Sequence, residues 1–293
     1  MTRFIHDQFA KDYLEELLNS YGNVSPSRPV TGEVQEIDIL FFPSIKQNPN
    51  LKVLGLLGRF AEYPAIFEPF RNAASEDEIG DCIFKLWQIK AELRREAKRD
   101  NTSRQESNIP KLWVLTPTAS SKVLSSFGAT QKKGWLPGVY FTVNALRTAI
   151  VAIHQLPDIS ETLWLRILGR GSIQEKAVLE LQSLSTYHPF RQATLELVYN
   201  LQKNLRVSQP LEPDDRELIM RLEPLYQQDR ELAKLEERRQ IIENMLEVRF
   251  GSLDSELITL VSAISTLPAK EFTPLLMQLS REELIARFGT QSS

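Results

Sequence analysis

The sequence contains one cysteine, Cys82, and three histidines, and both scarcities exclude kinds of site. A lone cysteine cannot form an intramolecular disulfide or a thiolate zinc cluster. His6, His154 and His188 lie far apart and show no spacing typical of metal ligands. The sequence therefore predicts neither a disulfide nor a zinc site built from cysteine and histidine.

The chain also lacks long apolar runs and a dominant charge. No stretch reaches the roughly 18 apolar residues typical of a membrane span. The first residues lack the basic start and apolar centre of a secretory signal, so we expect a cytoplasmic location. The net charge of −3 gives no strongly basic surface, so DNA contact would need a local patch. The 42% hydrophobic content suits one large or two modest globular domains.

Helix and strand patterns alternate in the first half of the chain and give way to helices alone after Pro157. The alternating segments span residues 7–20, 31–42, 51–61, 65–70, 75–98, 111–116, 119–127, 138–143 and 147–155. They predict an α+β (α/β-like) fold, in which helices flank a small mixed sheet. We expect an α/β core over 1–158, a helical extension over 159–209 and a helical C-terminal module over 210–293.

Local signals fix several helix ends. Three serines precede a glutamate by three residues, which is the spacing of a capping box: Ser75, Ser172 and Ser280. The stretch 22–29 predicts a break after the first helix. Pro210 and Pro213 predict a linker, and Pro224 is expected to open a long helix that ends at Phe250.

Two carboxylates stand inside apolar runs that predict strands, Asp38 within 36–42 and Glu68 within 65–71. Burying an unpaired carboxylate is costly, so a metal ion or a cation is the expected partner. If the strands are neighbours, both acids can bind one Mg²⁺, which prefers a few carboxylate oxygens and water. Glu15 or Glu16 of the first helix could complete the site. The alternative places these acids on the solvent face of a half-exposed sheet.

This arrangement resembles the PD-(D/E)XK nuclease fold, in its branch of recombination-promoting nucleases and transposase-like proteins. The resemblance implies a restriction-endonuclease-like core. The matching features are a leading helix with Glu16, Asp38 on one strand, Glu68 on the next, and a long helix. The stretch 248–288 is similar to a helical module attached to such proteins in cyanobacteria. The resemblance covers about two thirds of the chain and implies a Mg²⁺-dependent DNA endonuclease, with Glu16, Asp38 and Glu68 as metal ligands.

One departure from the family pattern concerns catalysis. The family places Lys or Gln two residues after the second acid, and this sequence has Phe70 there. Arg71 follows and would point to the opposite face of a regular strand. A bulge at Pro69 could bring Arg71 beside Glu68 as a substitute catalytic cation. Otherwise Arg71 pairs with a surface acid and the site is degenerate.

Two basic groups are candidate nucleic-acid contacts. Arg94, Arg95 and Lys98 lie toward the end of the long helix, and Lys132 and Lys133 lie in a glycine-flanked loop. They can form a phosphate-binding edge. The alternative is a solvated helix end, where cations favour the helix dipole.

Two functional hypotheses follow. The first is a metal-dependent DNA endonuclease. The second is a nuclease-like fold without catalysis that acts as a scaffold, binding a protein partner or a second copy through residues 210–293. Phe70 and the near-neutral charge favour the second hypothesis.

Overall fold

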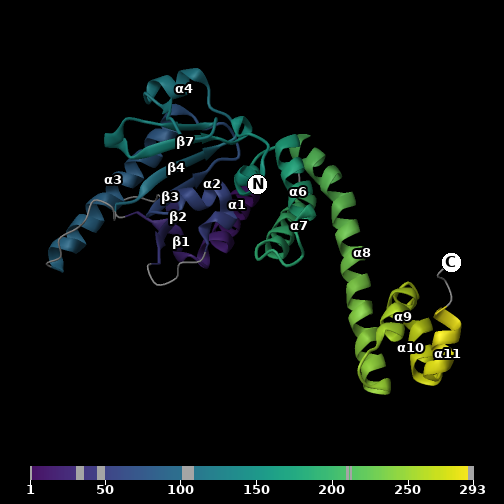
Figure 1. The fold of residues 1–293 in the computed structure, drawn as a ribbon. Helices are drawn as coiled ribbons and strands as arrows, with labels where there is room; N and C mark the ends of the chain where they lie inside the picture. Colours follow the sequence, from purple (N-terminus) through teal and green to yellow (C-terminus); the bar gives the residue numbers. More distant parts are fainter. Residues whose placement is uncertain are drawn as a thin grey trace. The chain divides into compact units, whose positions relative to one another are not determined.

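The computed structural model describes residues 2–30, 36–44, 50–100, 109–208, 211 and 213–289. The chain divides into two compact units, residues 1–222 and 223–293. The first contains the sheet and the second is helical (Figure 1). The expected α+β class is therefore confirmed.

A mixed sheet of seven strands runs through the described part of the first unit, in the order β1-β2-β3-β4-β7-β6-β5. The strands are β1 (Gly22–Pro29), β2 (Glu36–Pro43), β3 (Ala65–Pro69), β4 (Lys111–Thr116), β5 (Thr130–Gln131), β6 (Val139–Phe141) and β7 (Thr148–Ala152). β3, β4 and β7 are parallel neighbours, and the other pairs are antiparallel. The predicted pairing of 138–143 with 147–155 is confirmed by β6 and β7.

Helices lie around this sheet (Figure 1). They are α1 (Thr2–Asn19), α2 (Gly55–Phe60), α3 (Glu76–Arg99), α4 (Ser121–Ser126), α5 (Leu163–Arg166), α6 (Ser172–Ser183) and α7 (Arg191–Val207). Short 3₁₀ turns occupy Leu51–Leu54, Asn144–Leu146, Ile153–Gln155 and Ser160–Thr162. The apolar stripe of α3 packs on one sheet face, where Ile79 and Leu86 join Ile66 and Val114 in a buried cluster. α1 packs against β1 and α7.

The first helix ends at Asn19, as the break predicted at 22–29 requires, but the stretch itself is a strand that the sequence did not predict. It pairs antiparallel with β2 and has no further neighbour in the sheet order, which makes it an edge strand. An edge strand tolerates proline because an outward-facing position needs no N–H donor. Pro26 and Pro29 are therefore compatible with pairing, and their turn-like composition concealed the strand.

The capping predictions have mixed outcomes. Ser75 and Glu78 form the predicted reciprocal box at the start of α3, and Ser280 does the same with its glutamate in the second unit. The box predicted at Ser172 is wrong, because Gly171 occupies the N-cap position and no side chain caps α6. Ser172 is already inside the helix, one residue too late to cap it.

The Ser75 cap gives a stability prediction. The Ser75 hydroxyl accepts a hydrogen bond from the Glu78 N–H at 3.2 Å. Ser75→Ala removes this acceptor and should lower the free energy of unfolding by about 1 kcal/mol. Ser121→Ala, at an exposed serine on α4, should change it by less than about 0.5 kcal/mol. Urea unfolding of the full chain measures both variants, and equal effects would contradict a specific role for the cap.

The helix α8 spans Pro213–Phe250, so the prediction that Pro224 opens it is wrong. Pro213 takes the first position, where a missing N–H costs nothing. Pro224 lies inside, where it removes one hydrogen bond without ending the helix.

The second unit contains the end of α8 followed by α9 (Ser255–Ser265), α10 (Ala269–Gln278) and α11 (Arg281–Phe288). These helices share their own buried apolar cluster, which includes Leu246, Leu260, Phe272, Leu276 and Leu284. Within the described residues, no helix combines the length and apolar character needed to cross a bilayer.

Candidate metal and phosphate site

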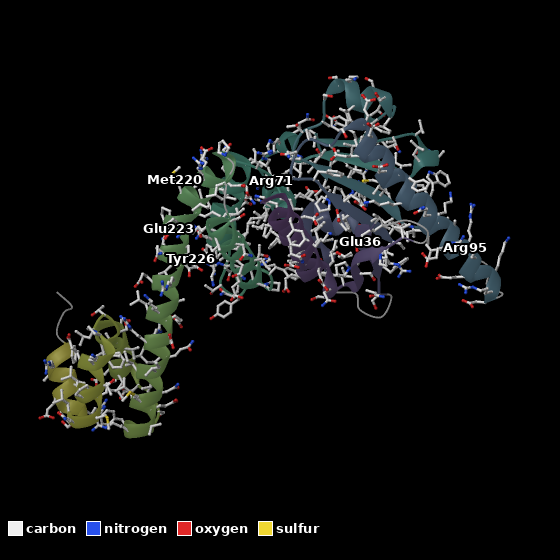
Figure 2. The ribbon with its side chains drawn as sticks, turned by 180° about the vertical axis from the view of Figure 1, so that it is seen from behind. Glu36, Arg71, Arg95, Met220, Glu223 and Tyr226 are labelled. Atoms are coloured by element: carbon white, nitrogen blue, oxygen red, sulfur yellow. The ribbon has the colours of Figure 1, made fainter. Side chains whose placement is uncertain are left out.

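A cavity of about 710 Å³ lies in the first unit and is lined by residues of α1, β2, β3 and α3. Its lining includes Asp38, Glu68 and Arg71, three of the residues predicted from the sequence. Figure 2 labels two lining residues, Glu36 on β2 and Arg71 just after β3, both within the sheet unit. The two predicted acids and the predicted cation therefore line the same cavity.

The two acids face each other across neighbouring antiparallel strands. Ile39 of β2 is the partner of Phe67 of β3, so the same register places Asp38 opposite Glu68. Side chains directly opposite in such a pair have Cβ atoms about 4.5–5.5 Å apart and point to the same sheet face. The sequence analysis required the two strands to be neighbours, and the structure shows that they are.

Glu68 is almost fully buried, with 2% of its surface exposed. Its Oε2 atom accepts a hydrogen bond from the Lys85 ammonium of α3 at 2.8 Å. Its Oε1 atom is buried. The main chain of Asp38 and the side chain of Cys82 also lie within hydrogen-bonding reach of this carboxylate.

Asp38 on β2 contacts charged side chains of α1. The Lys11 ammonium lies 3.0 Å from Asp38 Oδ1 and 3.0 Å from Asp7 Oδ2. Lys11 is buried, and Asp7 is four residues earlier on the same helix face. α1 therefore contributes one acid and one cation to the neighbourhood of the strand acids.

Burial dominates the ionisation of these groups. It raises the pKa of Glu68 to about 7, and the nearby Asp38 charge adds to the effect while Lys85 opposes it. Burial also raises the pKa of Asp38, helped by Asp7 and opposed by Lys11. For Lys85, burial acts to lower the pKa but Glu68 outweighs it, so the pKa is raised. Near neutral pH, Glu68 exchanges a proton while Lys85 stays charged.

This ionisation can be tested without any ligand. In carboxyl NMR of ¹³C-glutamate-labelled chain, one resonance that disappears in Glu68→Gln should titrate near pH 7. Asp38→Asn should move that titration to lower pH, because it removes a neighbouring negative charge. Lys85→Met should move it to higher pH. A Glu68 resonance that titrates at its ordinary value of 4.5 would contradict the buried pair.

The same shift predicts how stability changes with pH. Between the ordinary pKa of 4.5 and the folded value of about 7, the folded chain binds more protons at Glu68 than the unfolded chain does. The contribution of Glu68 to the free energy of unfolding therefore falls as pH rises through this window and is constant above it. Glu68→Gln should remove this part of the pH dependence.

Arg71 lies beyond the end of β3, so strand alternation does not determine its direction. Its guanidinium forms an ion pair with Asp215 at 3.0 Å, and Asp215 Oδ1 also contacts His6 Nε2 at 2.8 Å. Asp215 is fully buried. Burial and the Arg71 charge lower the pKa of His6 to about 4, so this imidazole is neutral at physiological pH. Arg71 is held at the cavity by an acid from the start of α8.

The charged residues that line the cavity are mostly acidic. Its lining carries Asp7, Glu36, Asp38, Glu68, Glu78 and Asp81 against the cations Arg71 and Lys85. Among the described residues, no group of three or more histidine, cysteine, aspartate and glutamate side chains is placed to hold a metal ion. The available donors are the opposed pair, Asp38 and Glu68. Two carboxylates fit Mg²⁺, because it retains several waters and takes further oxygens from a phosphate substrate.

Other predicted site residues lie elsewhere. Glu16 is exposed, does not line the cavity and sits about 13 Å further along α1 than Asp7, at about 1.5 Å per residue. Arg94, Arg95 and Lys98 are exposed on the distal part of α3, where Figure 2 shows Arg95 well away from Arg71.

Lys132 and Lys133 are also exposed and follow β5 at the far edge of the sheet. The structure therefore does not bring either predicted basic group to the cavity.

Sequence reasoning missed Lys85, Lys11 and Asp7. Lys85 lies three residues after buried Cys82, beside the apolar stripe of α3, and Lys11 interrupts the buried face of α1. A lysine within an apolar stripe is a usable signal, because it requires a buried acid as partner. The sequence alone does not identify the acid that pairs with each lysine.

No family model matches the chain, and neither the curated proteins nor the solved structures yield a match.

Proposed function

We propose that the chain is a Mg²⁺-dependent DNA endonuclease of the PD-(D/E)XK type. The observation that carries the proposal is the opposition of Asp38 and Glu68 on neighbouring strands at an acidic cavity. The order of elements also supports the nuclease-like core expected from the resemblance. A leading helix is followed by antiparallel strands that carry the acids, a long helix, and a strand parallel to β3.

In this proposal the carboxylates of Asp38 and Glu68 would hold the cation. When bound, the ion would supply a Lewis acid and a water of lowered pKa. Lys85 keeps the Glu68 carboxylate oriented through its 2.8 Å hydrogen bond and stabilises the ionised form that a metal requires.

Lys85 thereby takes the place of the lysine that the family pattern puts at Phe70, since it reaches the acid from α3 instead of from the strand. Arg71 lines the same cavity and can bind a phosphate oxygen. It cannot act as a base, because a guanidinium does not release its proton at physiological pH.

Supercoiled plasmid incubated with the purified full chain tests the activity. Nicking or linearisation is expected in Mg²⁺ or Mn²⁺ and should be absent in EDTA. No cleavage at high protein concentration in either metal would refute the proposed enzyme.

One observation favours a second candidate, a scaffold without catalysis. Both strand acids already have lysine partners, Lys85 for Glu68 and Lys11 for Asp38, which a purely structural ion-pair network would also show. The second unit offers exposed apolar side chains such as Leu232, Ile241 and Val248 for a protein partner or a second copy. A concentration-dependent mass in light scattering, together with inactive protein in both metals, would favour this candidate.

A further inference from the structure

Four cations gather around a cluster of aromatic rings near the start of β4. The Lys111 ammonium lies 4.2 Å from the Trp113 ring centroid and 4.1 Å from that of Phe141. Lys132 lies 4.9 Å from the same Phe141 ring. Arg59 stacks over Trp135 at 3.6 Å, and Lys111 is 5.7 Å from this ring as well. Shared rings therefore place Arg59, Lys111 and Lys132 in one group.

The fourth cation, Arg147, joins this group from the turn before β7. Its guanidinium donates a hydrogen bond to the carbonyl of Ile109 at 2.7 Å, two residues before Lys111. Its backbone has φ +49°, a left-handed conformation that residues other than glycine rarely adopt. The Arg59 guanidinium is held in a similar way, by the Gly134 carbonyl at 2.9 Å. Main-chain carbonyls thus orient both guanidinium groups.

No acid neutralises the group in the described part of the chain. None of the salt bridges there involves Arg59, Lys111, Lys132 or Arg147. The pKa of Lys111 is lowered to about 8, mainly by burial and in addition by the charges of Lys132, Arg147 and Arg59. Like charges held together without a counter-ion are unfavourable, so an anion would be attracted to the group.

The group lies on the sheet face opposite the acidic cavity. Glu68 is paired with Val114, whose side chain packs with α3 on one face. Trp113 precedes Val114 and therefore points to the other face, in register with Ala149 and Phe141 on the neighbouring strands. The Trp113 and Phe141 rings are buried beneath the cations. The group is thus separate from Asp38 and Glu68.

We infer that Arg59, Lys111, Lys132 and Arg147 form a binding site for phosphate groups, carried either by a free polyphosphate or by a nucleic-acid strand. The guanidinium group of arginine and the ammonium group of lysine are the usual partners of phosphate oxygens. Four cations from four separate segments suit consecutive phosphates better than a single small anion. This site does not depend on the proposed endonuclease activity.

Binding is measured with two probes in EDTA, so that metal-dependent cleavage cannot contribute. Tryptophan fluorescence follows titration of the full chain with pyrophosphate, because Trp113 and Trp135 adjoin the cations. Fluorescence anisotropy follows a labelled single-stranded oligonucleotide. Pyrophosphate that binds and displaces the oligonucleotide indicates a nucleic-acid site, and pyrophosphate binding alone indicates a free polyphosphate; both outcomes support the site.

Variants then locate the site. Lys111→Gln and Arg59→Gln should each weaken binding roughly tenfold, the loss expected for a charge-assisted hydrogen bond. Lys203→Gln removes an exposed lysine on α7 and should leave binding unchanged. Asp38→Asn/Glu68→Gln should also bind as the wild type does, which separates this site from the cavity. Circular dichroism confirms folding of each variant. If neither probe binds, or if Lys111→Gln and Arg59→Gln bind like Lys203→Gln, the inference is overturned.

Discussion

Asp38→Asn and Glu68→Gln should each lower Mg²⁺-dependent DNA cleavage by at least about 100-fold. Each substitution keeps the size of the side chain but removes a negatively charged oxygen donor. Loss of a residue that only supports a ligand already costs about 10–100-fold in metal-site function, and a direct ligand should cost more. Initial rates of plasmid nicking at a series of Mg²⁺ concentrations measure the effect.

Glu16→Gln is the matched control for these variants. It makes the same chemical change on an exposed residue of α1 that does not line the cavity. Its nicking rate should equal that of the wild type. The role of Asp38 and Glu68 would be contradicted if Glu16→Gln lowered the nicking rate as much as Glu68→Gln does. It would also be contradicted if Asp38→Asn kept the wild-type rate.

Lys85→Met should lower the same activity by about 10–100-fold, the range for residues that orient a ligand. The substitution leaves Glu68 buried without its 2.8 Å ammonium partner. The protonated carboxyl is then favoured, so Glu68 ionises at higher pH and binds metal less well at neutral pH. The pH profile of cleavage should therefore move to higher pH, and raised pH should restore part of the activity.

Lys90→Met provides the comparison on the same helix. Lys90 lies over the exposed Trp87 ring at 4.3 Å and does not line the cavity. Its removal changes the net charge equally but should leave the pH profile of cleavage in place. If Lys85→Met keeps the wild-type rate and profile, Lys85 does not position Glu68 for catalysis.

The sequence predicted the parts of the fold that depend on local patterns. The Ser75 capping box begins α3 as expected, because the cap and its glutamate are three residues apart. The paired strands β6 and β7 follow from short apolar runs separated by a turn. β1 could not be recognised, because its prolines indicate a turn unless the strand is known to be at an edge. Pro224 shows the same limit, since α8 continues through it although a proline favours a helix start.

The candidate site was predictable only in part, for a similar reason. Alternation along each strand places Asp38 and Glu68 on defined faces, but only the pairing of β2 with β3 brings them together. Lys85 is seventeen residues from Glu68 in sequence, and its contact depends on which sheet face α3 covers. Arg71 pairs with Asp215, 144 residues away, which no spacing rule could indicate.

The two lysines set a physical condition for metal binding. Each already neutralises one acid, at 2.8 Å for Lys85 and 3.0 Å for Lys11, so a cation must bind without displacing both. Glu68 would meet this condition if Oε1 coordinated the ion while Oε2 kept its ammonium partner. Asp38 would supply a second carboxylate from the neighbouring strand, and such an ion would take further oxygens from water or substrate.

Mn²⁺ binding followed by electron paramagnetic resonance tests the central claim, that Asp38 and Glu68 together hold a divalent cation. The free-ion signal reports unbound Mn²⁺ directly, so a titration of the full chain gives the number of bound ions. We expect one ion per chain, displaced by Mg²⁺ and lost in Asp38→Asn/Glu68→Gln but retained in Glu16→Gln. A wild-type chain that binds no Mn²⁺ at millimolar concentration, or a double variant that binds it equally well, would contradict the account.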